Sequence, residues 1–211
     1  MKTRSAELSG FLKSLYGAIA ARAQVDSDEL RVTEKLMQAL RLEQPSVSPN
    51  PVWLPVCALL DEAVECVTQA KVEQIPGQSV TVDSSVVDHA QALRNLAPQL
   101  RWWHRPDAAQ HGKPFADGHA NTTVIGKGGL EEHDDVWVGI SLLAPGIQYP
   151  EHHHPPEEVY LVLSRGHWQQ GGGDWYEPGI GGLVHNPPDI LHAMRSGSTP
   201  LLATWCLWKA H

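Results

Sequence analysis

The chain has few cysteines, no excess of positive charge and no long apolar run. Only Cys57, Cys66 and Cys206 occur among its 211 residues, an odd number without CxxC spacing. This pattern argues against a disulfide framework and against a thiolate metal site, because both need paired or closely spaced cysteines. We therefore expect small, buried, free thiols.

Charge and hydropathy also narrow the list of partners. The formal net charge is -8 and the pI is about 5.8, so there is no electrostatic reason to bind nucleic acid or an anionic membrane. The N-terminal stretch is basic, but Lys13, Ser14 and Tyr16 interrupt the apolar core that a signal peptide needs. No apolar run is long enough to span a bilayer. We expect a cytoplasmic protein with neither nucleic acid nor membrane as a partner.

The first hundred residues are typical of packed amphipathic helices. Apolar residues recur there at helical spacing. The hydrophobic content of the whole chain, 42%, is ample for a core. The predicted helices cover about Ser5 to Ala23, a segment capped by Asp26 and Ser27 and ended by Pro45, about Pro55 to Ala70, and Ser84 to Leu96. Because none carries a dense polar cluster, residues 1–100 are assigned a structural role, with a homodimer contact as a candidate.

The composition changes after Pro98 to short β-like segments rich in tryptophan, glycine and proline. The predicted strands are Thr122–Gly126, Val136–Leu143, Val159–Ser164, Gly182–His185 and Leu201–Trp208. Many short strands separated by glycine and proline turns indicate an antiparallel sandwich or barrel. The expected fold class is α+β, with a mainly-β domain over residues 101–211 and the helical segment packed against it.

The stretch Glu151–Gly166, EHHHPPEEVYLVLSRG, concentrates potential metal ligands beside a strand pattern. Side chains alternate along an extended chain, so His152, His154, Glu158 and Tyr160 are predicted on one face. His153 is expected to face away. Imidazole and carboxylate donors suit a divalent zinc, iron, manganese, cobalt or nickel ion better than calcium.

A second cluster, His185–Ser196, places His192 after a double-proline turn. It can complete the set of His154 and Glu158, with His152 as a fourth candidate. Other polar groups receive structural interpretations: Glu157 as a partner of the site or a solvated side chain, and the acidic run from Glu131 to Asp135 as a solvated turn. The remaining histidines lie in loop-like segments, where surface or structural roles are common; these are His104, His111, His119, His133, His167 and His185.

Two spaced motifs resemble those of the cupin family. Gly146-x5-His152-x-His154-x3-Glu158 is similar to the first cupin motif, and Gly181-x5-Pro187-x-Asp189-x2-His192 is similar to the second. Two departures affect turns rather than ligands: a glycine lies one position late at Gly166, and Asp189 stands where the second motif has glycine. The resemblance implies a small double-sheet antiparallel barrel.

The narrower resemblance is to the bacterial cupin-type dimethylsulfoniopropionate (DMSP) lyases, in particular the DddQ group. It rests on YPEHHHPPEEVYLVLS, on PPDILHAMRS and on the helical half before the barrel. It implies His154, Glu158 and His192 as metal ligands, Tyr160 as the catalytic base, and Tyr149 and His152 as substrate-pocket groups. The implied reaction releases dimethyl sulfide and acrylate.

Cupin barrels host many reactions, so two other functions stay open. An Fe(II)- and O₂-dependent dioxygenase would keep the same ligands without needing Tyr160 as a base, and a non-catalytic cupin would bind a small carboxylate. A sulfonium substrate favours aromatic walls, and residues 101–211 hold seven of the eight tryptophans, although sequence does not sort them into core and pocket.

Overall fold

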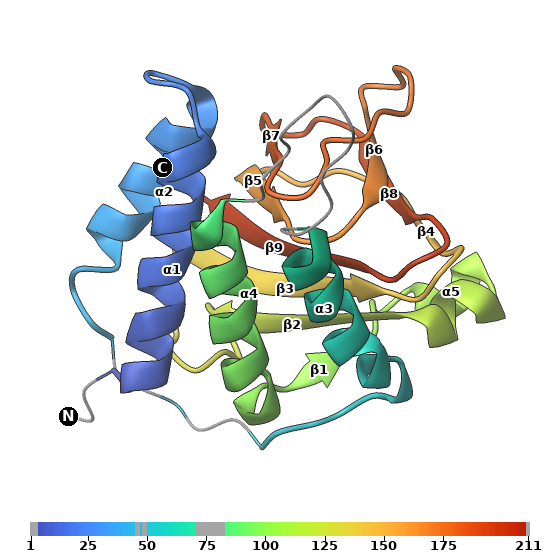
Figure 1. The fold of residues 1–211 in the computed structure, drawn as a ribbon, viewed down its shortest axis with the longest axis horizontal. Helices are drawn as coiled ribbons and strands as arrows, with labels where there is room; N and C mark the ends of the chain where they lie inside the picture. The colour runs from blue at the N-terminus through green and yellow to red at the C-terminus, as the bar shows by residue number, and fades with distance from the viewer. Residues whose placement is uncertain (1–3, 45–46, 48–49, 71–82, 210–211) are drawn as a thin grey trace.

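A computed structural model describes residues 4–44, 47, 50–70 and 83–209 (Figure 1). The four predicted helices are confirmed, although the second ends at Ala39 rather than near Pro45. The third opens with a turn of 3₁₀-helix. Two serines start helices in the expected way, since Ser5 and Ser27 accept hydrogen bonds from the backbone amides of Leu8 and Leu30. The helical elements are α1 Ala6–Arg22, α2 Asp28–Ala39, η1 Pro55–Leu59, α3 Leu60–Ala70, α4 Ser84–Leu96, η2 Ala97–Gln99, η3 Ala108–His111 and α5 Lys113–Gly118.

The strands form two antiparallel sheets. The large sheet has the order β1-β2-β3-β9-β5-β7, and the small sheet has the order β4-β8-β6. The five predicted strands all lie in the large sheet and are confirmed within a few residues at their ends. The strands are β1 Trp102–Trp103, β2 His119–Ile125, β3 Val136–Leu143, β4 Gln148–His152, β5 Glu157–Val162, β6 Gly166–Gln170, β7 Leu183–Asn186, β8 His192–Ser196 and β9 Leu201–Trp208.

None of the three strands of the small sheet was predicted from the sequence. Its strands are short, and polar residues or a proline break the alternation that marks a strand, as in Gln148–His152. Two histidines expected in loops lie in strands: His119 opens β2 of the large sheet, and His167 lies in β6 of the small sheet. His185, at the end of a predicted strand, lies in β7.

Both faces of the large sheet are buried. Its outer face packs against the helices in one continuous apolar core, and Figure 1 shows α1, α3 and α4 lying across this sheet. Its inner face and the small sheet enclose a second cluster. Strand β5 shows the alternation: Val159 and Leu161 belong to the outer core, whereas Tyr160 belongs to the inner cluster. The inner face is where the candidate site lies.

The acidic run before β3 is not simply a solvated turn. Glu131 is 0% exposed, and its carboxylate is held by Arg4, with Nε to Oε2 at 2.7 Å and Nη2 to Oε1 at 2.6 Å. The same carboxylate accepts a hydrogen bond from the amide of Gln44. The prediction was wrong for this residue because its partner Arg4 lies 127 residues away. Glu132 and Asp134 are exposed, as expected for that turn.

All three cysteines are free, as their spacing predicted. Cys57 and Cys206 are buried as expected, but Cys66 is partly exposed, so the expectation of burial was wrong for this thiol. Burial raises the pKa of the Cys57 thiol to about 11 and that of Cys206 to about 12, so both stay protonated at neutral pH. Among the described residues, no helix combines the length and the hydropathy needed to cross a bilayer.

Candidate metal centre

Three elements bring the predicted ligands together at one end of the barrel. His152 ends β4, His154 lies in the turn that follows, and Glu158 lies in β5. His192 begins β8, where it pairs in register with His152. The two motifs, which are about forty residues apart in sequence, therefore meet because β4 and β8 are neighbours in the small sheet.

The donor atoms of these four residues converge. One ring nitrogen from each of His152, His154 and His192 lies within 4.8 Å of the others. Glu158 Oε2 lies 3.4 Å from Nε2 of His154 and 3.3 Å from Nε2 of His192. The structure thus places His152 beside the two predicted histidine ligands.

Backbone carbonyls orient the imidazoles. Each of His152, His154 and His192 directs Nδ1 at a nearby carbonyl oxygen, that of Pro150, Pro156 and Ile190 respectively, at 2.9–3.0 Å. A carbonyl can only accept, so Nδ1 carries the proton and the lone pair of a neutral ring lies on Nε2. The Nε2 atoms of His154 and His192 are the ones that face Glu158. This is the tautomer that a histidine metal ligand requires.

The cluster fits a divalent cation. Glu158 is 3% exposed, and the buried Nε2 of His192 has no hydrogen-bond partner. Burying a carboxylate among imidazole lone pairs is costly unless a positive charge lies between them. Three nitrogens and one oxygen are a suitable set for zinc, iron, manganese, cobalt or nickel.

The pKa values show how closely the groups of the cluster interact. Burial alone would raise the pKa of Glu158, but the neighbouring His154 and His192 imidazoles hold it well below its usual range. Burial favours neutral His154, but Glu158 outweighs it and raises the pKa of that imidazole. Burial, together with the neighbouring His192, lowers the pKa of His152 to about 4. At neutral pH Glu158 is therefore ionised and His152 is neutral, which is the state in which both can bind a metal.

A further pair of amides fixes the carboxylate. Asn186, which pairs with Glu158 in register across β5 and β7, donates from Nδ2 to Oε2 of Glu158 at 2.8 Å. Gln170 in turn donates to Oδ1 of Asn186 at 2.6 Å. These side chains hold Glu158 in one orientation, and such support is typical of metal ligands.

Tyr160 and Tyr149 lie beside the cluster. Tyr160 is two residues beyond Glu158 on the same face of β5, and it pairs with Trp205 across β9. Burial and the neighbouring Glu158 carboxylate raise the pKa of Tyr160 well above its usual value. Tyr149 lies in β4, and its ring centroid is 5.0 Å from that of His152. The predicted pocket group Tyr149 therefore adjoins His152, and the predicted base Tyr160 lies near Glu158.

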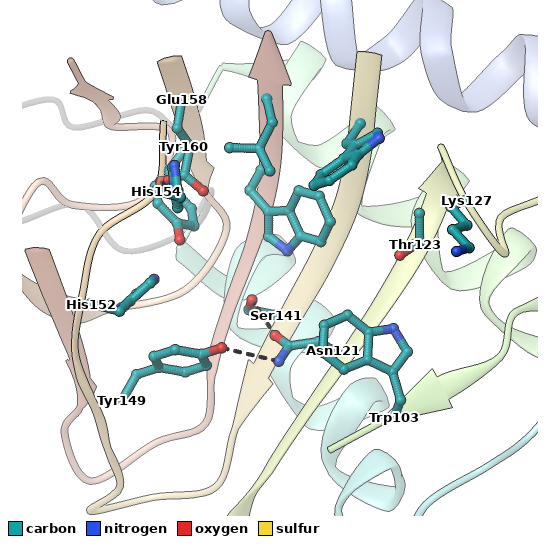
Figure 2. A pocket seen from close by; sticks show the side chains of 13 residues that line it. Trp103, Asn121, Thr123, Lys127, Ser141, Tyr149, His152, His154, Glu158 and Tyr160 are labelled. Atoms are coloured by element: carbon teal, nitrogen blue, oxygen red, sulfur yellow. Dashed lines mark hydrogen bonds and ion pairs between the residues drawn. The ribbon is translucent and has the colours of Figure 1, made fainter. Parts of the chain in front are cut away.

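A cavity of about 340 Å³ opens beside these groups (Figure 2). Most of its walls come from the inner face of the large sheet, where Trp205 packs against Gly139 so closely that a Cβ at Gly139 would be 2.1 Å from the indole. The lining residues are Trp103, Asn121, Thr123, Lys127, Trp137, Ser141, Tyr149, His152, His154, Glu158, Tyr160, Trp205 and Leu207. Three tryptophans thus face the pocket, whereas Trp102 and Trp168 are buried in the core.

Sequence reasoning missed several of these groups. Asn121 and Ser141 line the cavity, and the guanidinium of Arg105 lies with Cζ 5.5 Å from the centroid of the Tyr149 ring. One signal was present: asparagine is disfavoured in strands, yet Asn121 interrupts an otherwise strand-forming sequence. Nothing local marked Ser141 or Arg105.

His153 and Glu157, two polar residues beside the predicted ligands in sequence, both lie outside the cluster. His153 points away from the cluster, with its side chain 63% exposed, as its parity predicted. Glu157 neither contacts a metal ligand nor is freely solvated: it pairs with Arg31 of α2 and lies 2.8 Å from Nε2 of His185. It ties the barrel to the helical half instead.

The two departures from the cupin motifs have physical explanations. Asp189 has a φ of 59°, the left-handed conformation that aspartate tolerates better than most residues, so it can replace glycine there. Its amide also donates to the carbonyl of His154 at 2.9 Å. At Gly166, an added Cβ would lie 2.4 Å from Cδ1 of Leu201, so close packing requires glycine at this shifted position. Neither change disturbs a predicted ligand.

Two antiparallel sheets that enclose a pocket, with three histidines and a glutamate at one end, define a cupin. The family model for dimethylsulfoniopropionate lyase matches residues 28–203, and the chain belongs to that family.

Individual relatives agree with this assignment. The chain is 27% identical over 168 residues to the dimethylsulfoniopropionate lyase DddQ of Ruegeria pomeroyi, covering 78% of this chain and 76% of that protein. It is 26% identical over 108 residues to a putative dimethylsulfoniopropionate lyase DddL of Cereibacter sphaeroides, covering 51% of this chain and 45% of the relative. The crystal structure of DddQ from Ruegeria pomeroyi superposes with a TM-score of 0.71 at 21% identity, over 97% of this chain and 92% of that one.

Proposed function

We propose that this protein cleaves DMSP to dimethyl sulfide and acrylate by β-elimination. The observation that carries the proposal is the position of Tyr160, a potential base, on the same strand face as Glu158 and in the cavity that His154 and Glu158 also line. Membership of the DMSP lyase family supports the substrate.

The proposed metal ligands are His154, Glu158 and His192, with His152 close enough to serve as a fourth or to contact the substrate. Bound there, a divalent cation supplies positive charge that acidifies the Cα–H of a neighbouring carboxylate and favours the phenolate of Tyr160. That charge has to offset the burial and the Glu158 carboxylate, which together raise the pKa of Tyr160. The fit of the donors admits zinc, iron, manganese, cobalt or nickel.

Tyr160 then acts as the general base. Its phenolate takes the proton from Cα of DMSP, and the electron pair of that bond forms the Cα–Cβ double bond. The Cβ–S bond breaks with its electrons going to sulfur, so the sulfonium leaves as neutral dimethyl sulfide and acrylate remains. General-base catalysis of this kind contributes typically about 10²–10⁴-fold.

The pocket suits the cationic end of the substrate. Trp103, Trp137 and Trp205 line the cavity, and aromatic faces attract a sulfonium without needing hydrogen bonds. Trp205 neighbours Tyr160 in the ladder, so a sulfonium near this indole would lie within one strand spacing of the base. This arrangement supports a base at the proton on Cα and an aromatic wall at the sulfonium on Cβ, the two groups that leave in the elimination.

The decisive experiment follows dimethyl sulfide in the headspace by gas chromatography. Purified protein is stripped with a chelator and then reloaded separately with each of the five metals. We expect release to stop after stripping and to return with at least one metal. A reloaded protein that consumes oxygen without releasing dimethyl sulfide would indicate a dioxygenase, and tight DMSP binding without turnover would indicate a binding module.

The variant His192→Ala tests the metal set in the same preparation. It removes a ligand that is 3% exposed, so metal content measured by mass spectrometry should fall at least about tenfold. His153→Ala is the matched control, because that imidazole adjoins the ligands in sequence but points to solvent. Equal metal content in both variants would contradict the assigned ligand set.

A further inference from the structure

A chain of hydrogen bonds leads from the large sheet to Tyr149. Ser141 Oγ donates to Oδ1 of Asn121 at 2.7 Å, and Nδ2 of Asn121 donates to the hydroxyl oxygen of Tyr149 at 3.3 Å (Figure 2). Asn121 and Ser141 pair in register across β2 and β3 and are 2% and 3% exposed. The proposed metal and base do not use either residue, although both line the cavity.

The donors and acceptors along this series of hydrogen bonds are fixed. Because the Ser141 hydroxyl occupies the carbonyl oxygen of the Asn121 amide, the amide presents its NH₂ group to Tyr149. The hydroxyl oxygen of Tyr149 is therefore an acceptor on this side. Arg105, whose Cζ lies 5.5 Å from the Tyr149 ring centroid, carries only donors and cannot accept the phenolic proton. The proton of Tyr149 is left to point into the cavity that this side chain lines.

We propose that Ser141 and Asn121 are positioning residues that hold Tyr149 as a hydrogen-bond donor to the substrate carboxylate. The inference rests on the proposed function, since it names a carboxylate as the group that Tyr149 meets. Tyr149 keeps its proton throughout, so its role is separate from that of Tyr160.

The arrangement would favour the transition state. As the Cα proton leaves, negative charge grows on the carboxylate oxygens, and a donor already aimed at them is worth more at that moment than in the ground state. Ser141 and Asn121 are fixed by strand pairing, so the donor is oriented when the protein folds rather than when substrate arrives. We expect the loss of this orientation to affect kcat more than KM.

The change Asn121→Asp tests the direction of the chain. A carboxylate has the shape of the amide but only accepts, so it would draw the Tyr149 proton away from the cavity. We expect kcat/KM for DMSP to fall about 100-fold, the lower end of the range for losing one oriented donor. In a Tyr149→Phe background the same change should cost less than about threefold, because no hydroxyl remains to be turned.

The pair Ser141→Ala and Ser141→Thr tests the start of the chain. Alanine frees the Asn121 amide to rotate, whereas threonine keeps the hydroxyl and should restore most of the rate. The matched control is Ser164→Ala, which removes another buried serine hydroxyl, one that donates to the carbonyl of Pro200 away from the cavity. It should change the melting temperature but leave kcat/KM near that of the wild type.

Acrylate binding, measured by calorimetry on metal-loaded protein, separates this inference from the proposed reaction. Asn121→Asp should weaken acrylate binding when Tyr149 is present and have little effect when it is phenylalanine. If the wild type releases no dimethyl sulfide but this dependence on Tyr149 holds, the reaction is wrong and the positioning stands. If Asn121→Asp and Ser141→Ala cost as much with phenylalanine at 149 as with tyrosine, in rate and in binding, they do not act through Tyr149 and the inference is overturned.

Discussion

The two faces of the large sheet are built from the same strands but differ in chemistry. On the outer face, β5 and β9 place Val159, Leu161 and Leu202 against the helices in an apolar core. On the inner face, the alternate positions of β5 place Glu158 and Tyr160 beside the candidate site. Because neighbouring residues point to opposite faces, packing and proposed chemistry are interleaved one residue apart.

This interleaving indicates which side chains are free to serve function. The outer face excludes water and is held by many apolar contacts, so substitutions there should act on stability. The inner face keeps polar groups that packing alone would not favour, such as the buried pair Asn121 and Ser141. Substitutions there should act on turnover. Adjacent residues of β5 offer the sharpest test of this division.

Tyr160→Phe should have the largest effect, and on activity alone. It removes the proposed base while leaving every proposed ligand, so kcat should fall about 10²–10⁴-fold with metal content unchanged. Stability should change by about 1 kcal/mol or less, because only a hydroxyl is lost. Headspace chromatography, metal analysis and urea unfolding measure the three quantities.

Tyr16→Phe is the control for Tyr160→Phe. Tyr16 is 38% exposed on α1, in the helical half, so the loss of its hydroxyl should leave the rate near that of the wild type. A fully active Tyr160→Phe protein would show that Tyr160 is only part of the scaffold.

Leu161→Ala, one residue along the same strand, should show the opposite behaviour. Leu161 is 0% exposed in the helix-facing core, and such truncations cost about 2–5 kcal/mol of unfolding free energy. The remaining folded protein should keep its kcat, because the side chain does not line the cavity. Urea unfolding and the rate per folded molecule check this. A loss of kcat comparable to that in Tyr160→Phe would show that the two faces are not functionally separate.

The success of sequence reasoning followed the same division. The helices and the strands of the large sheet were predictable because a regular apolar period reports a face buried in the core, as in Val136–Leu143. The polar strands of the small sheet carry no such period. The proximity of His154, Glu158 and His192 was predictable from motif spacing, whereas their roles stay predictions.

Long-range polar partners lay beyond the reach of sequence reasoning. Tyr149 and Asn121 are 28 residues apart, and Arg4 and Glu131 are 127 residues apart. No local sequence pattern therefore indicates either contact. The same limit explains why Glu131 was misassigned to a solvated turn. Such contacts are fixed by the register of the sheets and by helix packing, which only the folded chain reveals.

The outer face has a polar exception, and it provides the smallest and most specific prediction. His89 of α4 is 0% exposed; its Nε2 lies 2.9 Å from Oγ1 of Thr204 and its Nδ1 lies 3.1 Å from Oγ of Ser14. Burial lowers the pKa of this imidazole from 6.5 to about 3. The folded protein therefore keeps His89 neutral at a pH where the unfolded chain protonates it.

His89 should make the helix-facing core sensitive to acid. Above the unfolded pKa of 6.5 neither state binds the proton, so stability does not depend on pH through this group. Below pH 6.5, His89 is protonated in the unfolded chain but not in the folded protein, so stability falls as the pH is lowered to about 3. We compare wild type with His89→Gln, because the other titrating groups are common to both and largely cancel. The stability advantage of the wild type at about pH 8 should shrink by roughly 2 kcal/mol at about pH 5, measured by urea unfolding. If the stability difference between the wild type and His89→Gln stays constant over this range, His89 can be protonated within the fold. The outer face would then be more accessible to water than its apolar contacts indicate.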